Sequence, residues 1–153
     1  LFAFLLFISS YLIAYADIVG NEKIFFSTKF NEVNIRNGPG KNHFVIGKFL
    51  KKGIPLLTLD KYENWHRVTD LEGKEGWVSS SQLQSERYGI ITKDQSILMS
   101  FPNKKSKKIA IFKKNVNFKI NSCDLSWCNV KHNNLNGWIQ KTHIWGVHAK
   151  EII

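Results

Sequence analysis

An internal repeat is the feature of this chain that most constrains its fold. Four landmarks recur in the same order: a proline turn, a basic pair before Gly53 or Asn115, a Trp-x-x-Val segment, and a Gly-Trp pair followed by an aliphatic residue. The turn prolines, Pro39 and Pro102, lie 63 residues apart. Two tryptophan pairs lie 62 and 61 residues apart, Trp65 with Trp127 and Trp77 with Trp138. Two single-residue deletions in loops align the copies, so the sequence predicts two copies of one small folding unit.

Within each copy the hydrophobic residues alternate over short runs, separated by clusters of Gly, Asn, Asp and Lys. In the first copy these runs are residues 45–50, 54–60, 65–69 and 75–79. Short strands about ten residues apart are typical of a small barrel or sandwich. Gly53 and Asn115 occupy equivalent positions, and both residue types accept a left-handed backbone. We therefore expect an all-β protein of two tandem small barrels, at residues 24–84 and 90–148, joined by a linker at residues 85–89.

Residues 1–16 are uncharged and apolar, and they end in Ala14-Tyr15-Ala16 before Asp17. This pattern predicts a helical secretory signal peptide, truncated at its start because the initiating Met and basic segment are missing, with cleavage before Asp17. The alternatives are an uncleaved membrane anchor and a buried strand or helix. A spanning helix needs about 20 apolar residues, and Asp17 interrupts this run. Export predicts a periplasmic or secreted protein. Contact with the membrane is expected only if the leader is not cleaved.

Residues 33–40 read Val-Asn-Ile-Arg-Asn-Gly-Pro-Gly, and Ile46-Gly47, a Trp-x-x-Val segment and Gly-Trp-Val follow them. This series resembles a bacterial SH3 domain. The tandem arrangement is closest to an exported two-repeat SH3-like family of Gram-negative bacteria, in which the second copy is degenerate, has two Cys separated by four residues, and ends in Trp-Gly-Val, here residues 145–147. The resemblance implies a five-stranded, partly open barrel with long loops on one side. It also implies binding to cell-wall polymer or protein rather than catalysis.

Alternation along the predicted strands suggests which tryptophans face outward. If Val68 points into the core, His66 does so too, while Trp65 and Arg67 point away. In eukaryotic SH3 domains the matching Trp lies in the peptide groove, which the resemblance carries to Trp65. The candidate ligand-binding residues are Arg36, Trp65, Trp77, Trp127 and Trp138. Exposed indoles can stack on a sugar face or grip a proline. The alternative is structural: Trp65 and Trp77 cover the open barrel end or fill the contact between the copies.

Cys123 and Cys128 flank a four-residue connection of hairpin length. Opposed positions on such a hairpin bring the two Cβ atoms within reach of a disulfide, which persists in an oxidising compartment. The alternative is a redox pair or a nucleophilic Cys. The spacing is not Cys-x-x-Cys and no nearby His has an obvious activating place, so we predict a structural disulfide.

The chain is basic, with 22 Lys and Arg against 12 Asp and Glu and a formal net charge of +10. Residues 89–148 hold ten Lys against two acidic residues. The excess is concentrated in six residues: Lys104, Lys105, Lys107, Lys108, Lys113 and Lys114. They are candidates for contact with a polyanion, such as phosphate-bearing lipid, anionic wall polymer or an acidic partner. The alternative is a solvated surface that aids solubility. Nucleic acid is not an expected partner, because export argues against it and no base-reading motif is present.

The five His residues are dispersed without metal-ligand spacing, and no Ser-His-Asp order, phosphate loop or paired carboxylates stand out. We expect no enzymatic activity, metal or cofactor. The leading hypothesis is a non-catalytic exported module that binds cell-wall polymer or an envelope protein. The alternative is a rigid tandem scaffold for protein–protein interaction with no polymer ligand, which predicts Trp65 or Trp145 buried between the copies. The sequence makes no prediction of oligomeric state.

Overall fold

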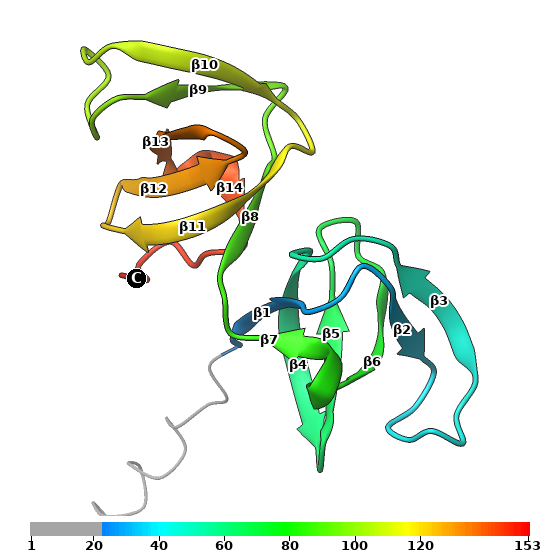
Figure 1. The fold of residues 1–153 in the computed structure, drawn as a ribbon. Helices are drawn as coiled ribbons and strands as arrows, with labels where there is room; N and C mark the ends of the chain where they lie inside the picture. The colour runs from blue at the N-terminus through cyan, green and yellow to red at the C-terminus, as the bar shows by residue number, and fades with distance from the viewer. Residues whose placement is uncertain (1–22) are drawn as a thin grey trace, which may run out of the picture.

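The computed structural model describes residues 23–153, so the expected signal peptide at residues 1–16 lies outside the described residues. Within residues 23–153 the chain forms two antiparallel sheets of seven strands each and two short 3₁₀ turns (Figure 1). The first sheet, here called the first copy, holds β1 to β7, and the second copy holds β8 to β14. The expected all-β class is confirmed for this part of the chain.

The first copy orders its strands β3-β2-β6-β5-β4-β1-β7. The strands are β1 (Phe25–Thr28), β2 (Val33–Arg36), β3 (Val45–Phe49), β4 (Pro55–Tyr62), β5 (Trp65–Thr69), β6 (Glu75–Ser79) and β7 (Leu83–Gln84), with a 3₁₀ turn at Ser80–Gln82.

The second copy repeats the same order seven strands later, β10-β9-β13-β12-β11-β8-β14. Its strands are β8 (Tyr88–Ile91), β9 (Gln95–Met99), β10 (Lys108–Lys113), β11 (Asn117–Cys123), β12 (Trp127–His132), β13 (Leu135–Gln140) and β14 (Ile144–Trp145), with a 3₁₀ turn at Lys141–His143. The repeat read from the sequence is therefore also a repeat of topology.

The sheets contain more strands than the five that the resemblance implied. In the first copy β2 to β6 are contiguous in the sheet, and β1 and the two-residue β7 extend it beyond β4. Three of the four residues of β1 are buried: Phe25 and Ser27 at alternate positions, and Thr28 at the end of the strand. Short flanking strands of this kind escape a search based on longer alternating runs.

Each copy has its own hydrophobic core, and the alternation in β5 follows the sequence prediction. His66 and Val68 are buried, Trp65 is half-buried and Arg67 is exposed. The core of the first copy comprises Val33, Ile35, Phe49, Leu56, Val68, Val78 and Leu83. The core of the second copy comprises Ile91, Leu98, Phe112, Phe118, Ile120, Cys123, Cys128, Val130, Ile139, Ile144 and Val147.

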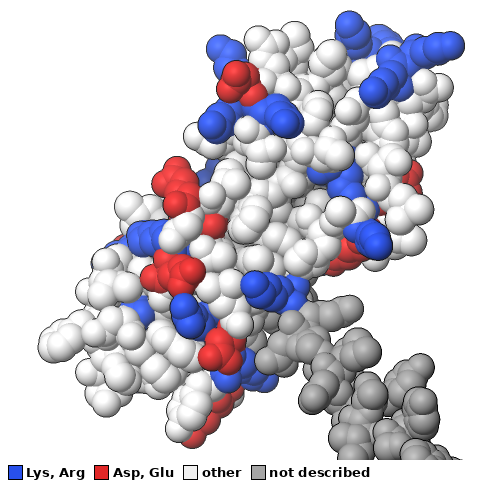
Figure 2. Space-filling model, turned by 180° about the vertical axis from the view of Figure 1, so that it is seen from behind, with Lys and Arg blue, Asp and Glu red and all other residues white. Residues whose placement is uncertain are grey.

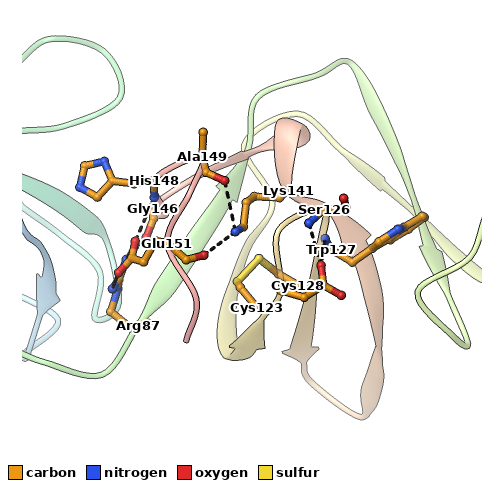
Figure 3. The surroundings of a disulfide bond; sticks show 11 residues. Arg87, Cys123, Ser126, Trp127, Cys128, Lys141, Gly146, His148, Ala149 and Glu151 are labelled. Atoms are coloured by element: carbon orange, nitrogen blue, oxygen red, sulfur yellow. Dashed lines mark hydrogen bonds and ion pairs between the residues drawn. A yellow bond between two sulfur atoms is a disulfide. The ribbon is translucent and has the colours of Figure 1, made fainter.

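Cys123 and Cys128 form the predicted disulfide, across directly opposed positions of β11 and β12. Their Cα atoms lie 4.1 Å apart, and both side chains are buried. The turn between them is shaped by Asp124, whose carboxylate oxygen accepts hydrogen bonds from the backbone N–H groups of Ser126 and Trp127, each at 2.7 Å (Figure 3). The disulfide therefore closes a hairpin whose geometry is also set by an Asx turn.

The two copies contact each other directly. The indole N–H of Trp145 donates to the carbonyl oxygen of Pro55 at 3.3 Å, and the Trp145 ring meets the ring of Phe25 edge-on with centroids 5.1 Å apart. The side-chain amide of Asn117 donates to the carbonyl of Gly53 at 2.7 Å. Gly53 has a φ of +82°, and a Cβ there would lie 2.6 Å from the Tyr88 ring. Glycine is therefore required at this contact for both conformation and space.

The left-handed conformation at the two equivalent positions is also confirmed. Asn115 has a φ of +68°, close to that of Gly53. Asn is among the few non-glycine residues that adopt this region routinely, so the second copy keeps the turn after it has lost the glycine.

Candidate ligand-binding groove

A groove of about 410 Å³ lies on the second copy, at one end of its sheet. It is lined by Gln95, Ser96, Ile97, Met99, Lys104, Lys108, Trp127, Gln140 and His143. The lining thus includes one candidate tryptophan and two of the candidate lysines.

Two hairpins, β9–β10 and β12–β13, bring most of these residues together. Trp127 is the first residue of β12 and lies opposite Gln140, the last residue of β13. Lys108 opens β10 opposite Met99, and Lys104 lies in the loop between β9 and β10. The groove therefore has a half-buried indole and an amide from one hairpin and two ammonium groups from another.

The loop that holds Lys104 is ordered by its own side chains. The Ser106 hydroxyl lies 3.0 Å from the Phe101 carbonyl and 2.9 Å from the Asn103 carbonyl. The Asn103 side chain accepts a hydrogen bond from the Lys105 N–H at 2.8 Å. These local bonds are typical of Asx and Ser turns and fix the loop without secondary structure.

The groove is electropositive. Among the described residues, no Asp or Glu contributes to its lining. Burial, followed by the positive charges of Lys93 and Lys104, holds the pKa of His143 below its ordinary value of 6.5. The imidazole is therefore neutral at pH 7, and the positive charge of the groove comes from its lysines. In Figure 2, Lys and Arg side chains stand out at the upper end of the molecule, where one acidic side chain is seen among them, and both charge types occur on the middle and lower parts.

Ser96 and His143 form a hydroxyl–imidazole pair in the wall of the groove, with Oγ and Nδ1 2.9 Å apart. Ser96 is only 2% exposed, and the lysines around His143 reduce the basicity of its ring. The hydroxyl is thus too buried to reach a substrate freely, and no carboxylate of the lining orients the imidazole. This pair fixes the position of the ring rather than forming an activated nucleophile.

The other four candidate lysines do not line the groove. Lys105 and Lys107 are exposed on the same loop, and Lys113 and Lys114 lie at the far end of β10. Lys113 is five residues from Lys108, which is roughly 17 Å along a strand. The structure therefore divides the predicted cluster into a groove pair, a loop pair and a distant pair.

The remaining candidate residues lie elsewhere. Arg36 donates to the carbonyl of His43 at 2.7 Å and to that of Lys41 at 3.3 Å, so its guanidinium is bound to the turn that follows β2. Trp77 is half-buried in β6 opposite Arg36, and Trp138 is half-buried in β13 opposite Met99. Trp65 is half-buried at the start of β5. None of these four lines the groove of the second copy.

The groove also contains residues that were not singled out from the sequence. Gln95, Gln140 and His143 supply polar groups, and Ile97 and Met99 supply an apolar wall. The position of Gln140 could have been found from the sequence, because β12 and β13 form a tight hairpin in which the last residue of β13 lies opposite Trp127, the first residue of β12. The sequence does not indicate that Gln95 and His143 line the groove, because their positions depend on the packing of β9 against the 3₁₀ turn at Lys141–His143.

Within residues 23–153, no three His, Cys, Asp or Glu side chains are grouped to hold a metal ion. The helical turns in this part of the chain are also too short and polar to span a bilayer.

Comparison with known proteins places the chain in a family. A model described as the bacterial SH3 domain matches residues 29–85 and again residues 93–146. Among solved structures, NlpC2 from Trichomonas vaginalis is 15% identical with a TM-score of 0.35, and NlpC1 from the same organism is 13% identical with a TM-score of 0.35.

These two similarities cover 80% of this chain but only 47% of NlpC2 and 45% of NlpC1, so the chain spans about half the length of either protein. At this level neither structure bears on its function. No curated protein matches the chain. The two family matches together cover most of the sequence, and the chain belongs to the bacterial SH3 domain family.

Proposed function

We propose that this protein is a non-catalytic, exported binding module whose second copy binds an anionic cell-wall polymer in the groove at Trp127. One observation carries the proposal: an indole and two lysines from separate elements share one groove whose lining, among the described residues, includes no acidic side chain. Membership of a family of binding domains and the disulfide, which suits an oxidising compartment outside the cytoplasm, are consistent with it.

The chemistry of the groove matches that of peptidoglycan. The face of an indole packs against the apolar face of a sugar ring, and Trp127 offers such a face. The ammonium groups of Lys104 and Lys108 attract the carboxylates of the stem peptides. The amides of Gln95 and Gln140 can exchange hydrogen bonds with sugar hydroxyls and acetamido groups. The groove therefore offers three kinds of contact to a polymer with sugar rings and carboxylates.

The test is sedimentation of the chain without residues 1–16 with purified peptidoglycan at low salt. We expect wild-type protein in the pellet and at least tenfold weaker binding of Trp127→Ala and of Lys104→Ser/Lys108→Ser. Lys113→Ser/Lys114→Ser is the matched control, because it removes the same charge at the other end of β10, outside the groove, and it should bind nearly as wild type does. Absence of wild-type protein from the pellet, or equal losses for the two lysine pairs, would contradict the proposal.

The contact between the copies favours a second candidate, a rigid tandem scaffold that docks another protein. That alternative predicts Trp65 or Trp145 buried between the copies, and Trp145 is half-buried there and hydrogen-bonded to Pro55. Arg87, between β7 and β8, is also held by an ion pair with Glu151 and by a hydrogen bond to the Gly146 carbonyl. Limited trypsin proteolysis tests rigidity: a scaffold resists cleavage after Arg87, whereas independent domains are cut there rapidly.

A further inference from the structure

A second hollow, of about 340 Å³, lies on the first copy and is separate from the Trp127 groove. It is lined by Lys23, Ile24, Phe26, Thr58, Leu59, Asp60, Lys61 and His66. Its walls come from residues 23 and 24 before β1, the start of β1, the second half of β4 and the start of β5. We call it the β4 pocket.

Two polar atoms of the β4 pocket are buried without a hydrogen-bond partner among the described residues: Nδ1 of His66 and Oγ1 of Thr58. His66 is only 8% exposed, and its ring packs against that of Phe26 with centroids 5.0 Å apart. Buried polar atoms are nearly always satisfied in folded proteins, so each exception needs an explanation. Both residues line the hollow, where a water molecule or the polar group of a ligand would supply the missing hydrogen bonds.

The second copy shows what occupies the equivalent place there. The repeat places Lys61 at the position of Cys123 and His66 at that of Cys128, and both pairs are directly opposed in their hairpins. In the second copy the disulfide is part of the hydrophobic core. On the side of β11 away from β12, Ile153 forms two backbone hydrogen bonds with Cys123, of 2.9 and 3.1 Å. Residues 149–153, here called the tail, therefore pair with the edge of β11 through Ile153.

This tail is held in place by several contacts (Figure 3). The buried ammonium of Lys141 donates to the carbonyls of Glu151 and Ala149. The carboxylate of Glu151 is paired with Arg87 and accepts a hydrogen bond from the His148 N–H at 2.9 Å. Ile153 itself packs against the core of the second copy. Ala149 and Lys150 form a turn, and Ile153, held by these contacts, is therefore a built-in example of a residue that pairs with this edge.

The corresponding edge of the first copy is open within residues 23–153. Strand β1 pairs with β4 only from Pro55 to Leu57, and one further bond joins the Thr58 N–H to the Ile24 carbonyl. Both backbone groups of Cys123 point outward to Ile153, so the equivalent groups of Lys61 point outward as well. The Lys61 N–H is bonded to the carboxylate of Asp60 at 2.7 Å, an exposed local contact that an incoming carbonyl can replace.

We propose that the β4 edge and pocket bind an extended peptide segment of a partner protein, which pairs with Lys61 as Ile153 pairs with Cys123. The segment places an apolar side chain against Ile24, Phe26 and Leu59, and its polar groups reach His66 and Thr58. Two lysines against one aspartate in the lining favour an acidic residue next to the apolar one. Strand addition of this kind gives affinity through the backbone and specificity through the pocket.

The probe is a synthetic capped peptide with the sequence of residues 149–153, Ala-Lys-Glu-Ile-Ile, added to isotope-labelled protein without residues 1–16. We expect saturable amide shift changes at residues 58–61 and at His66. Lys61→Pro should weaken binding at least tenfold, because proline removes the edge N–H and is tolerated on an edge strand. Lys61→Ser keeps that N–H and should lose less than Lys61→Pro.

A second variant separates loss of the site from loss of folding. His66→Leu fills the pocket with an apolar group, so the protein should stay folded while peptide binding weakens at least tenfold. Lys104→Ser/Lys108→Ser should bind the peptide as wild type does, which separates this proposal from that for the groove. The proposal would be overturned if the peptide caused no amide shift changes, or if the changes were confined to β11. It would also be overturned if binding were seen only after residues 17–22 are also removed, because the chain itself would then occupy the pocket.

Discussion

The indole N–H of Trp145, in the last strand of the second copy, donates to the carbonyl oxygen of Pro55, at the start of β4 in the first copy. The same indole packs on Phe25 of β1. A single side chain thus joins the two sheets by a hydrogen bond and an aromatic contact. The tandem copies therefore form a contact that substitution at one position can weaken.

Replacing Trp145 with Ala should loosen the two copies from each other. The variant loses the aromatic contact and the hydrogen bond, which for a half-buried indole costs about 2 kcal/mol. We expect calorimetry to resolve two unfolding transitions and trypsin to cleave faster after Arg87. Trp145→Phe, which keeps a ring but no N–H donor, should lose only about 1 kcal/mol. A single unchanged transition in the Ala variant would show that the contact does not couple the copies.

Reduction of the disulfide should destabilise the second copy selectively. Closing a loop of this length restricts the unfolded chain by roughly 2 kcal/mol in the loop-entropy model. Urea unfolding with and without reductant, followed by amide signals from each copy, measures the effect. Cys123→Ser/Cys128→Ser should match the reduced wild type and be insensitive to reductant. An equal loss in both copies would contradict a local role for the disulfide.

The ion pair between Arg87 and Glu151 should make stability depend on pH in the acid range. Burial alone would raise the pKa of Glu151, but hydrogen bonds from Arg87 and the His148 N–H, with the charge of Arg87, together hold it below its ordinary value of 4.5. A lowered carboxyl pKa contributes stability that is present above pH 4.5 and is lost as the pH falls through the lowered pKa. Urea titrations from pH 7 to pH 2 should therefore show a smaller acid loss in Glu151→Gln than in wild type. Parallel curves for the two proteins would refute this.

His66 should make the first copy sensitive to mild acid. Burial, followed by the charge of Lys61, holds the pKa of His66 below 6.5, so the folded state binds a proton less readily than the unfolded chain does. Stability is then fully present above pH 6.5 and is lost as the pH falls below it toward the lowered pKa. His66→Leu should remove this part of the pH dependence, measured as the urea midpoint of the first copy between pH 8 and pH 5. A wild-type midpoint that does not change over that interval would contradict the prediction.

Much of the fold could be predicted because it depends on local periodicity. Two-residue alternation placed His66 and Val68 inside β5 and left Arg67 exposed, and hairpin spacing placed Cys123 opposite Cys128. The repeat also predicted the shared topology and the left-handed Asn115. The strands β7 and β14 could not be predicted, because each has only two residues, too few to show an alternation of apolar and polar side chains.

The groove and the tail contact depend on packing between distant segments, and the sequence indicates them only in part. Trp127, Lys104 and Lys108 could be chosen by residue type, but nothing local shows that the loop between β9 and β10 brings them together while Lys113 stays apart. Residues 149–153 have no hydrophobic period, yet Ile153 pairs with Cys123 because the buried Lys141 holds the tail. That Arg36 is bound to its own turn was likewise not visible in the sequence.

The role of the groove is tested most directly by the salt dependence of binding to purified peptidoglycan, measured as dissociation constants from 20 to 300 mM NaCl for wild type and Lys104→Ser/Lys108→Ser. Ion pairs with polymer carboxylates are screened as salt rises, so wild-type affinity should fall steeply over this range. The double variant should bind at least tenfold more weakly at 20 mM NaCl and show a clearly shallower slope. Wild-type affinity that does not change with salt, or two parallel slopes, would show that the groove lysines do not hold the polymer.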